Sequence, residues 1–137
     1  MRLVLDTNII ISALFWNGKP RRVLRDCWHG KHRLLVSFSI LDELDRVLGK
    51  KFGVRPGTRG RIIWTILKMA ELVHPVTKLG VIAANPQDDD VLETAISGKA
   101  DAIVTGDKHL LTLKRFQGVA IRSAKEALNA QSWNEEE

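Results

Sequence analysis

Short apolar runs alternate with longer helical patterns along this chain, and this alternation limits the possible fold more than any other feature. The strand-type runs occupy residues 2–5, 33–36, 72–76, 102–105 and 119–121. They lack the polar alternation of half-exposed strands, which favours strands covered on both faces of a parallel sheet. Pro75 makes the run at 72–76 the weakest of these predictions.

Helical patterns separate the apolar runs. They occupy residues 8–16, 20–28, 39–48, 61–72, 88–97, 108–113 and 123–130. Proline and glycine gather between them at 18–20, 53–60 and 85–86, which we interpret as connections. This order predicts an α/β fold, a three-layer α/β/α sandwich around a mostly parallel central sheet of about five strands.

A chain of 137 residues suits one domain. We expect a single domain over 1–130 and a short, disordered acidic tail over 131–137. The single cysteine, Cys27, excludes an intrachain disulfide and argues against a cysteine-based zinc site. The N-terminus does not have the form of a signal peptide, and the apolar run at 9–16 is too short to span a bilayer. We therefore expect a cytoplasmic protein without a membrane partner.

The net charge of +5 comes from 21 basic and 16 acidic residues, and it suggests a polyanionic partner. From residue 46 to residue 68 there are seven cations and no acid. Such a stretch can bind phosphates without reading sequence, although an ordinary solvated surface explains it equally well. The candidate RNA-binding residues are Arg46, Lys50, Lys51, Arg55, Arg59 and Arg61.

Two of the strand-type runs end in an aspartate. Asp6 directly follows the run at 2–5, and Asp107 comes two residues after the run at 102–105. Chemistry in an open α/β sheet takes place beyond the carboxyl ends of the strands, so parallel neighbours would bring both carboxylates to one edge. Each aspartate could instead begin a turn or cap a helix. Two aspartates in equivalent positions favour a shared site.

Three consecutive acids, Asp88, Asp89 and Asp90, begin the helical pattern at 88–97. At about 100° per residue, Asp88 lies within the stripe centred on Leu92, Asp89 at its edge and Asp90 toward solvent. An acid aimed at the sheet is costly unless it is hydrogen-bonded or binds a cation. We expect Asp88 in the site with Asp89 as its substitute, although Asp88 could also be a plain helix cap.

Glu43 lies at the margin of the apolar face of the pattern at 39–48, seven residues after Val36. Alone it would be an ordinary solvated helix residue, but this position puts it at the same sheet edge as the aspartates. Four clustered carboxylates cannot all stay ionised without cations, and Mg²⁺ or Mn²⁺ suits such oxygen ligands. Such a site activates a water molecule for phosphodiester hydrolysis. The metal ligands and catalytic residues would be Asp6, Glu43, Asp88 and Asp107.

Other common chemistries lack their motifs. The sequence contains no P-loop and no dinucleotide-binding GxGxxG after a strand. It contains no GxSxG nucleophile elbow, and its histidines show no paired-ligand spacing. An aspartyl-phosphate phosphatase would need a second acid at position 8, where the chain has Asn8.

Four segments together resemble the PIN-domain family, in particular its subgroup of toxins from toxin–antitoxin systems. The segments are 1–10 (MRLVLDTNII), 40–44 (ILDEL), 85–95 (NPQDDDVLETA) and 100–107 (ADAIVTGD). The resemblance implies a parallel-sheet α/β/α fold and an Mg²⁺- or Mn²⁺-dependent endoribonuclease. It carries into the family's acidic metal site Asp6, Glu43, Asp88 and Asp107.

The resemblance has further implications. Asn8 and Thr105 match polar positions that support the metal site. A homodimer and a cognate antitoxin protein are implied as partners, besides RNA. Asn85 and His109 depart from the family pattern, because the family often has acids at these positions. They motivate the alternative function, a non-catalytic PIN-like scaffold that binds RNA or protein.

Trp64 lies within the helical pattern at 61–72. It lies away from the buried stripe of the pattern at 61–72, and Ile63 and Leu67 add a second apolar face. An outward tryptophan can stack on a base or anchor a protein interface. The second apolar face favours the protein interface.

Overall fold

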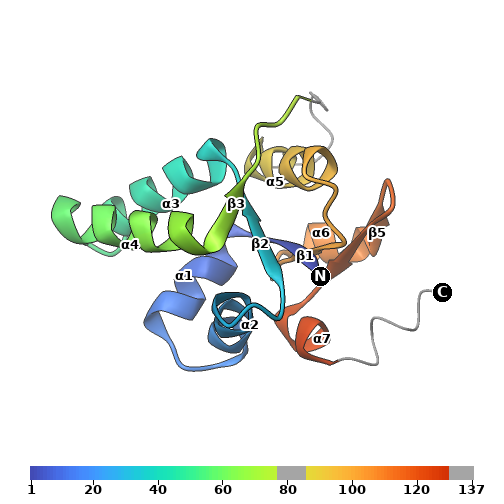
Figure 1. Ribbon diagram of the computed structural model, residues 1–137, viewed down its shortest axis with the longest axis horizontal. Coiled ribbons are helices and arrows are strands. Elements are labelled where there is room, and N and C mark those ends of the chain that lie inside the picture. The colour runs from blue at the N-terminus through green and yellow to red at the C-terminus, as the bar shows by residue number, and fades with distance from the viewer. Residues whose placement is uncertain (77–85, 130–137) are drawn as a thin grey trace.

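A computed structural model describes residues 1–76 and 86–129, with the side chains of residues 86–88 left out. The predicted acidic tail therefore lies outside the described residues. Six strands form one sheet in the order β3-β2-β1-β4-β6-β5 (Figure 1). The strands are β1 (Arg2–Leu5), β2 (Arg33–Val36), β3 (Ala70–Leu72), β4 (Ala102–Val104), β5 (Arg115–Phe116) and β6 (Val119–Arg122).

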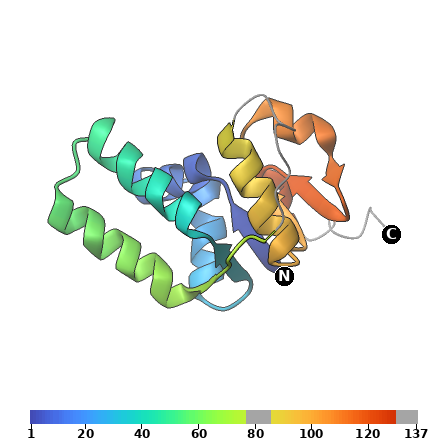
Figure 2. The same cartoon turned by 90° about the horizontal axis from the view of Figure 1, so that it is seen from above.

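Helices cover the sheet on both faces, which confirms the predicted α/β/α sandwich. They are α1 (Thr7–Phe15), α2 (Lys19–Trp28), α3 (Phe38–Lys50), α4 (Pro56–Met69), α5 (Pro86–Ser97), α6 (Lys108–Leu113) and α7 (Ala124–Leu128). Helix α5 packs on β1, β2 and β4, whereas α1, α2 and α7 pack together on the opposite side (Figure 1). Seen from above, α3 and α4 lie side by side (Figure 2).

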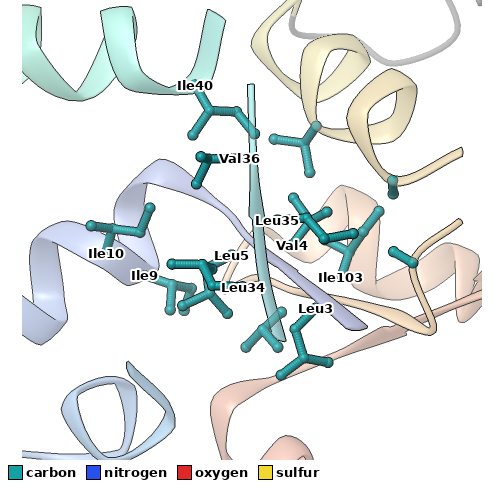
Figure 3. Close-up of a cluster of buried hydrophobic side chains, with 14 of the residues drawn as sticks. Leu3, Val4, Leu5, Ile9, Ile10, Leu34, Leu35, Val36, Ile40 and Ile103 are labelled. Carbon is teal, nitrogen blue, oxygen red and sulfur yellow. The ribbon is translucent and has the colours of Figure 1, made fainter. Parts of the chain in front are cut away.

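The core is built from strands whose side chains point alternately to the two helical layers. Val4, Leu35 and Ile103 lie on the side of α5, and Leu5 and Leu34 lie on the side of α1 (Figure 3). All five are at most 1% exposed. Because both faces are covered, these strands are continuous apolar runs, as the sequence predicts.

The register of the central strands fixes the position of the site. Strand β1 pairs with β4 in parallel, and Leu5 lies opposite Val104. The backbone N–H of Asp6 continues this ladder by donating to the carbonyl of Val104 at 2.9 Å. The residues that follow β1 and β4 therefore leave the sheet side by side at its carboxyl edge.

At the amino ends of the strands, an ion pair joins β1 to β3, and the residue after α5 approaches the sheet closely. Arg2 on β1 donates to both carboxylate oxygens of Glu71 on β3, at 3.1 and 2.8 Å. Gly98 follows α5, and a Cβ there would lie 2.9 Å from Val73 and 3.0 Å from Leu35. A side chain at position 98 would therefore press α5 away from the sheet.

Three sequence predictions need correction. The third strand is β3 at Ala70–Leu72 rather than 72–76, because Pro75 cannot donate to a ladder, and the helix predicted over 61–72 therefore ends at Met69. Helix α4 begins at Pro56, inside the predicted connection 53–60, since proline suits the first turn of a helix. Strand β5 was not predicted, because two residues are too few for a periodic pattern. It pairs antiparallel with β6, so the sheet is mostly parallel.

No helix within the described residues is both long and apolar enough to cross a membrane.

Candidate active site

Asp6 is the central acid at the carboxyl edge of the sheet. It directly follows β1, and its side chain makes no cap hydrogen bond to α1, although it occupies the N-cap position. The residue is 8% exposed. Burial raises the pKa of the Asp6 carboxyl above its ordinary value, and the nearby charge of Asp107 raises this pKa further. Asp6 is thus a buried acid at the start of α1, and the backbone N–H groups of Thr7 and Asn8 partly oppose the rise in its pKa.

Thr105 links the two aspartates that follow the strands. Its side-chain Oγ1 donates to Oδ2 of Asp6 at 2.9 Å and accepts from the backbone N–H of Asp107 at 3.0 Å. Thr105 is fully buried. The hydrogen bond from Thr105 lowers the pKa of Asp6, partly opposing the effect of burial. One hydroxyl therefore fixes how the Asp6 carboxylate lies relative to the Asp107 backbone.

Asp107 combines a helix cap with a place in the site. Its Oδ1 accepts from the backbone N–H groups of His109 at 2.7 Å and Leu110 at 3.4 Å, at the start of α6. The capping interpretation of this residue is therefore confirmed. The charge of Asp107 still acts on Asp6, as the raised pKa of Asp6 shows, so capping and a metal-binding role are compatible.

Glu43 reaches the same edge from α3. Ser37 caps this helix by accepting from the backbone N–H of Ile40 at 3.4 Å. Glu43 accepts a hydrogen bond from Thr7 Oγ1 at 3.1 Å, which ties α3 to the first turn of α1. Burial raises the pKa of Glu43, and the charge of Asp6 raises it as well. Glu43 and Asp6 therefore share one electrostatic environment.

Helix α5 carries the three predicted acids, of which the structure describes the side chains of Asp89 and Asp90. Asp89 is 8% exposed, and Asp90 is partly buried. Asp90 is therefore half-buried rather than out in solvent as predicted, and its charge contributes to the raised pKa of Glu43. The side chain of Asp88 lies outside the described residues, so its predicted role as a metal ligand stays a prediction.

The reason for this difference is a second buried side of α5. Thr94, one turn after Asp90, is fully buried, and its Oγ1 donates to Oγ of Ser37 at 2.9 Å. The prediction centred the buried stripe on Leu92 and considered only the sheet. Because α5 also packs on α3, the side that carries Thr94 and Asp90 points toward Glu43.

The other predicted residues differ in their exposure and in the contacts that they make. Asn8 is exposed in the first turn of α1. Arg46 is exposed on α3, and its charge lowers the pKa of Glu43, which places it beside the acids. Arg59 is committed elsewhere, because it donates to Asp45 at 2.9 Å and to the carbonyl of Val54 at 2.7 Å. The remaining predicted RNA-binding cations, all exposed, are Lys50, Lys51, Arg55 and Arg61.

The donor set suits a hard divalent cation. It consists of carboxylate oxygens, and two of the carboxyls have raised pKa values that a nearby positive charge would relieve. Among the side chains that the structure describes, no group of three or more acids, histidines or cysteines is arranged so that it could hold a metal ion. The predicted set of four includes Asp88, whose side chain is not described, so the full set is not tested.

Comparison with known proteins identifies the family of the chain. Residues 2–109 match the PIN domain family. The chain belongs to the PIN-domain family. Family members are generally ribonucleases. No curated protein sequence matches the chain.

Two solved structures share the fold of this PIN domain. One is VapBC2 from Rickettsia felis bound to a DNA fragment from their promoter, with a TM-score of 0.62 and 17% identity over 90% of this chain and 98% of that chain. The other is VapBC-1 from nontypeable Haemophilus influenzae, with a TM-score of 0.64 and 18% identity over 91% of this chain and 99% of that chain. At this identity the likeness concerns the fold alone.

The resemblance pointed to Thr105 as a supporting residue, but sequence reasoning missed the other hydroxyl groups near the acids of the PIN domain. Thr7 supports Glu43, and the pair Ser37 and Thr94 joins α3 to α5. The position of Thr7 directly after the strand-ending Asp6 is a local signal that could have identified it. Ser37 and Thr94 are 57 residues apart in the sequence, and no local sequence pattern predicts their contact.

Proposed function

We propose that this PIN domain is a metal-dependent endoribonuclease that cleaves single-stranded RNA with a metal-activated water. The observation that carries the proposal is the set of acids at one sheet edge, with the buried Asp6 joined to the half-buried Asp107 through Thr105 and the half-buried Glu43 held by Thr7. A bound Mg²⁺ or Mn²⁺ would supply an activated water and stabilise charge on the phosphate and the leaving oxygen.

The chain's own residues do the holding and orienting. Asp6, Glu43 and Asp107, with Asp88 or Asp89 from α5, would provide the oxygen ligands. Thr105 fixes the Asp6 carboxylate through its 2.9 Å hydrogen bond, and burial keeps bulk water away from that carboxylate. No protein nucleophile is required in this scheme.

A cleavage assay on unstructured and structured RNAs tests the proposal. We expect cleavage of the unstructured RNA with Mg²⁺ or Mn²⁺, and loss of cleavage with EDTA or in the Asp6→Asn and Glu43→Gln variants. Asp42→Asn is the matched control, because Asp42 is an exposed acid next to Glu43 on α3. Cleavage that survives both EDTA and the Asp6→Asn substitution would refute the proposal.

A non-catalytic scaffold is the second candidate. His109 is exposed at the start of α6 where the family often has an acid, and the other departure, Asn85, lies outside the described residues. Calorimetry separates the two candidates. RNA binding without any Mg²⁺ or Mn²⁺ binding at millimolar concentration would favour the scaffold.

Biologically, the proposal is that the protein acts in the cytoplasm as the toxin of a toxin–antitoxin pair, with a cognate antitoxin as its partner. Family membership and the shared fold with two VapBC structures support this role. Expression in a bacterial host should arrest growth, and expression of Asp6→Asn at the same level should not. Equal growth arrest by both proteins would contradict the role.

The partners also include a second copy of the chain. A groove of about 630 Å³ lies along α3 and α4, where Phe38 and Trp64 are 61% and 62% exposed. Burial of such aromatic surface is a common source of association energy. Sedimentation should show a dimer for the protein and a monomer for Trp64→Glu. An unchanged dimer in Trp64→Glu would exclude this face.

A further inference from the structure

Three aromatic side chains gather on the surface where α1 and α3 end. Phe15 is the last residue of α1, Trp16 follows it, and Phe52 follows α3. The rings of Phe15 and Phe52 are stacked, with centroids 4.6 Å apart and planes 15° apart. Trp16 meets Phe52 edge-on at 6.3 Å. The three rings, which we call the aromatic platform, therefore hold one another in fixed orientations.

The platform is not part of the hydrophobic core. Phe15, Trp16 and Phe52 are 40%, 57% and 39% exposed, and none of them belongs to the cluster of buried core residues. Keeping three large rings partly in water forgoes the stabilisation that their burial would bring. The arrangement therefore calls for an explanation other than packing of the fold.

Helices α1 and α3 connect the platform to the acidic site. They pack against each other, and at one end Thr7 on α1 donates to Glu43 on α3. At the other end, Phe15 and Phe52 stack. Eight residues separate Thr7 from Phe15, which corresponds to about 12 Å along the helix axis. At about 3.4 Å per stacked nucleotide, this distance spans roughly three or four nucleotides.

Cations line the same path. On α3, Arg46 and Lys50 follow Glu43 by three and seven residues, so the three side chains share one face of the helix. Lys51 directly precedes Phe52, and both lysines are exposed. No acid occurs between residues 46 and 68. The path from the acidic site to the platform therefore offers positive charge to a phosphate backbone.

We propose that the aromatic platform is a base-stacking subsite for single-stranded RNA, three or four nucleotides away from the scissile phosphate. The subsite rests on the proposed function in that RNA is the substrate. Aromatic rings stack on any base, and flanking cations follow the backbone, which is how single strands are bound without sequence preference. The uninterrupted positive charge and the continuity with the acidic site favour RNA over a protein partner here.

The test measures binding of RNA by a protein that cannot cut it. In the Asp6→Asn background, fluorescence anisotropy at one fixed salt concentration compares a labelled 12-nucleotide RNA with a strand of equal length that lacks bases. Trp16→Leu and Phe52→Leu remove an aromatic ring and retain apolar bulk. Trp28→Leu is the matched control, because Trp28 is also 57% exposed but ends α2.

We expect Trp16→Leu and Phe52→Leu to weaken binding of the complete RNA by about five- to one-hundred-fold, the range for loss of stacking on one base. Binding of the strand without bases should not change, and Trp28→Leu should behave as the parent. Equal affinity of Trp16→Leu and the parent for the complete RNA would overturn the proposal. An equal loss for both strands would overturn it too.

The cleavage assay separates this inference from the proposed function. In the chain that retains Asp6, Trp16→Leu should raise KM for a long RNA and leave kcat unchanged. RNA binding that depends on the platform, without any RNA cleavage, would refute the enzymatic function and support the subsite. RNA cleavage that does not change in Trp16→Leu and Phe52→Leu would support the enzymatic function and refute the subsite. A Trp16→Leu variant that binds RNA normally but changes from dimer to monomer would assign the platform to a protein contact instead.

Discussion

The hydroxyl of Thr105 is the single group whose removal tests most directly how the acids are held. Thr105→Val keeps the shape of the side chain and removes only its donor and acceptor. The substitution takes a hydrogen bond from Asp6 Oδ2 and another from the backbone N–H of Asp107. Both partners then remain in a pocket where water cannot easily replace the lost bonds, since Thr105 itself is fully buried.

The expected loss follows from the two bonds. A hydrogen bond to a charged group contributes about 1.5–3 kcal/mol and one between neutral groups about 1 kcal/mol, so Thr105→Val should cost about 2–4 kcal/mol of unfolding free energy. Thr105→Ser keeps the hydroxyl and loses one methyl group, which costs about 1 kcal/mol. The difference between the two variants isolates the hydrogen bonds from the packing.

The pH dependence provides a second, independent check. Burial raises the pKa of Asp6 above its ordinary value of 3.8, and the Thr105 hydrogen bond opposes this rise. A raised carboxyl pKa means that the folded state binds more protons, so stability falls as pH rises from the unfolded pKa through the folded pKa. Thr105→Val raises the pKa of Asp6 further. The part of its deficit that comes from Asp6 should therefore be small below pH 4 and complete at neutral pH, whereas the part that comes from the Asp107 N–H should not change with pH.

Urea denaturation of the three proteins at pH 3.5 and pH 7 measures these quantities, and an RNA cleavage assay accompanies it. Groups that orient metal ligands typically contribute 10- to 100-fold, so cleavage by Thr105→Val should fall by about that factor while Thr105→Ser stays near the original rate. If Thr105→Val were as stable as Thr105→Ser at pH 7, the hydroxyl would not be supporting an ionised Asp6 and the reasoning would be wrong.

Three further predictions concern packing, thiol reactivity and charge. Gly98→Ala should lower the unfolding free energy, measured by urea denaturation, by about 1–3 kcal/mol, because a Cβ there would meet the side chains of Val73 and Leu35. Gly60→Ala on α4 has open space around it and should raise the unfolding free energy by about 0.5–1 kcal/mol. Burial raises the pKa of Cys27 to about 12. Iodoacetamide at pH 8 should therefore label Cys27 quickly in the unfolded protein and very slowly in the native protein. Rapid labelling of the native protein would contradict the burial of this thiol. Glu43→Gln should raise the melting temperature of the metal-free protein, because it removes a like charge beside Asp6. The substitution should also reduce the increase in melting temperature that Mg²⁺ causes. A lower melting temperature of the metal-free variant would show that the two charges do not repel.

The parts of the fold that the sequence predicts well are those decided by strong local patterns. The runs at 2–5 and 33–36 are strands with the predicted bounds, because continuous β-branched and leucine-rich segments between polar residues have few alternatives. The parallel pairing of β1 and β4 follows from the α/β order, and it places Asp6 and Asp107 at one edge. Local pattern and topology together were sufficient for this half of the site.

The parts that were missed depend on tertiary contacts. The helical wheel for α5 considered one neighbour, the sheet, and so directed Asp90 to solvent. The Thr94–Ser37 contact shows that α3 is a second neighbour, and that contact turns Asp90 toward Glu43. The early start of α4 at Pro56 was masked by Gly57 and Gly60, which lie in the first turns of the helix and whose low helix propensity is overridden there.

The supporting groups around the acids share one property, which explains the electrostatic state of the site. Thr105 and Thr7 are neutral donors, so they orient Asp6 and Glu43 and lower their pKa values without neutralising the charge. Arg46 is the cation that lowers the pKa of Glu43, yet it is exposed and so is screened by solvent. Repulsion between the buried Asp6 and the half-buried Glu43 therefore persists in the protein alone. A divalent cation would relieve it where hydroxyl groups cannot, and the same residual negative charge would oppose an RNA phosphate that approached without one.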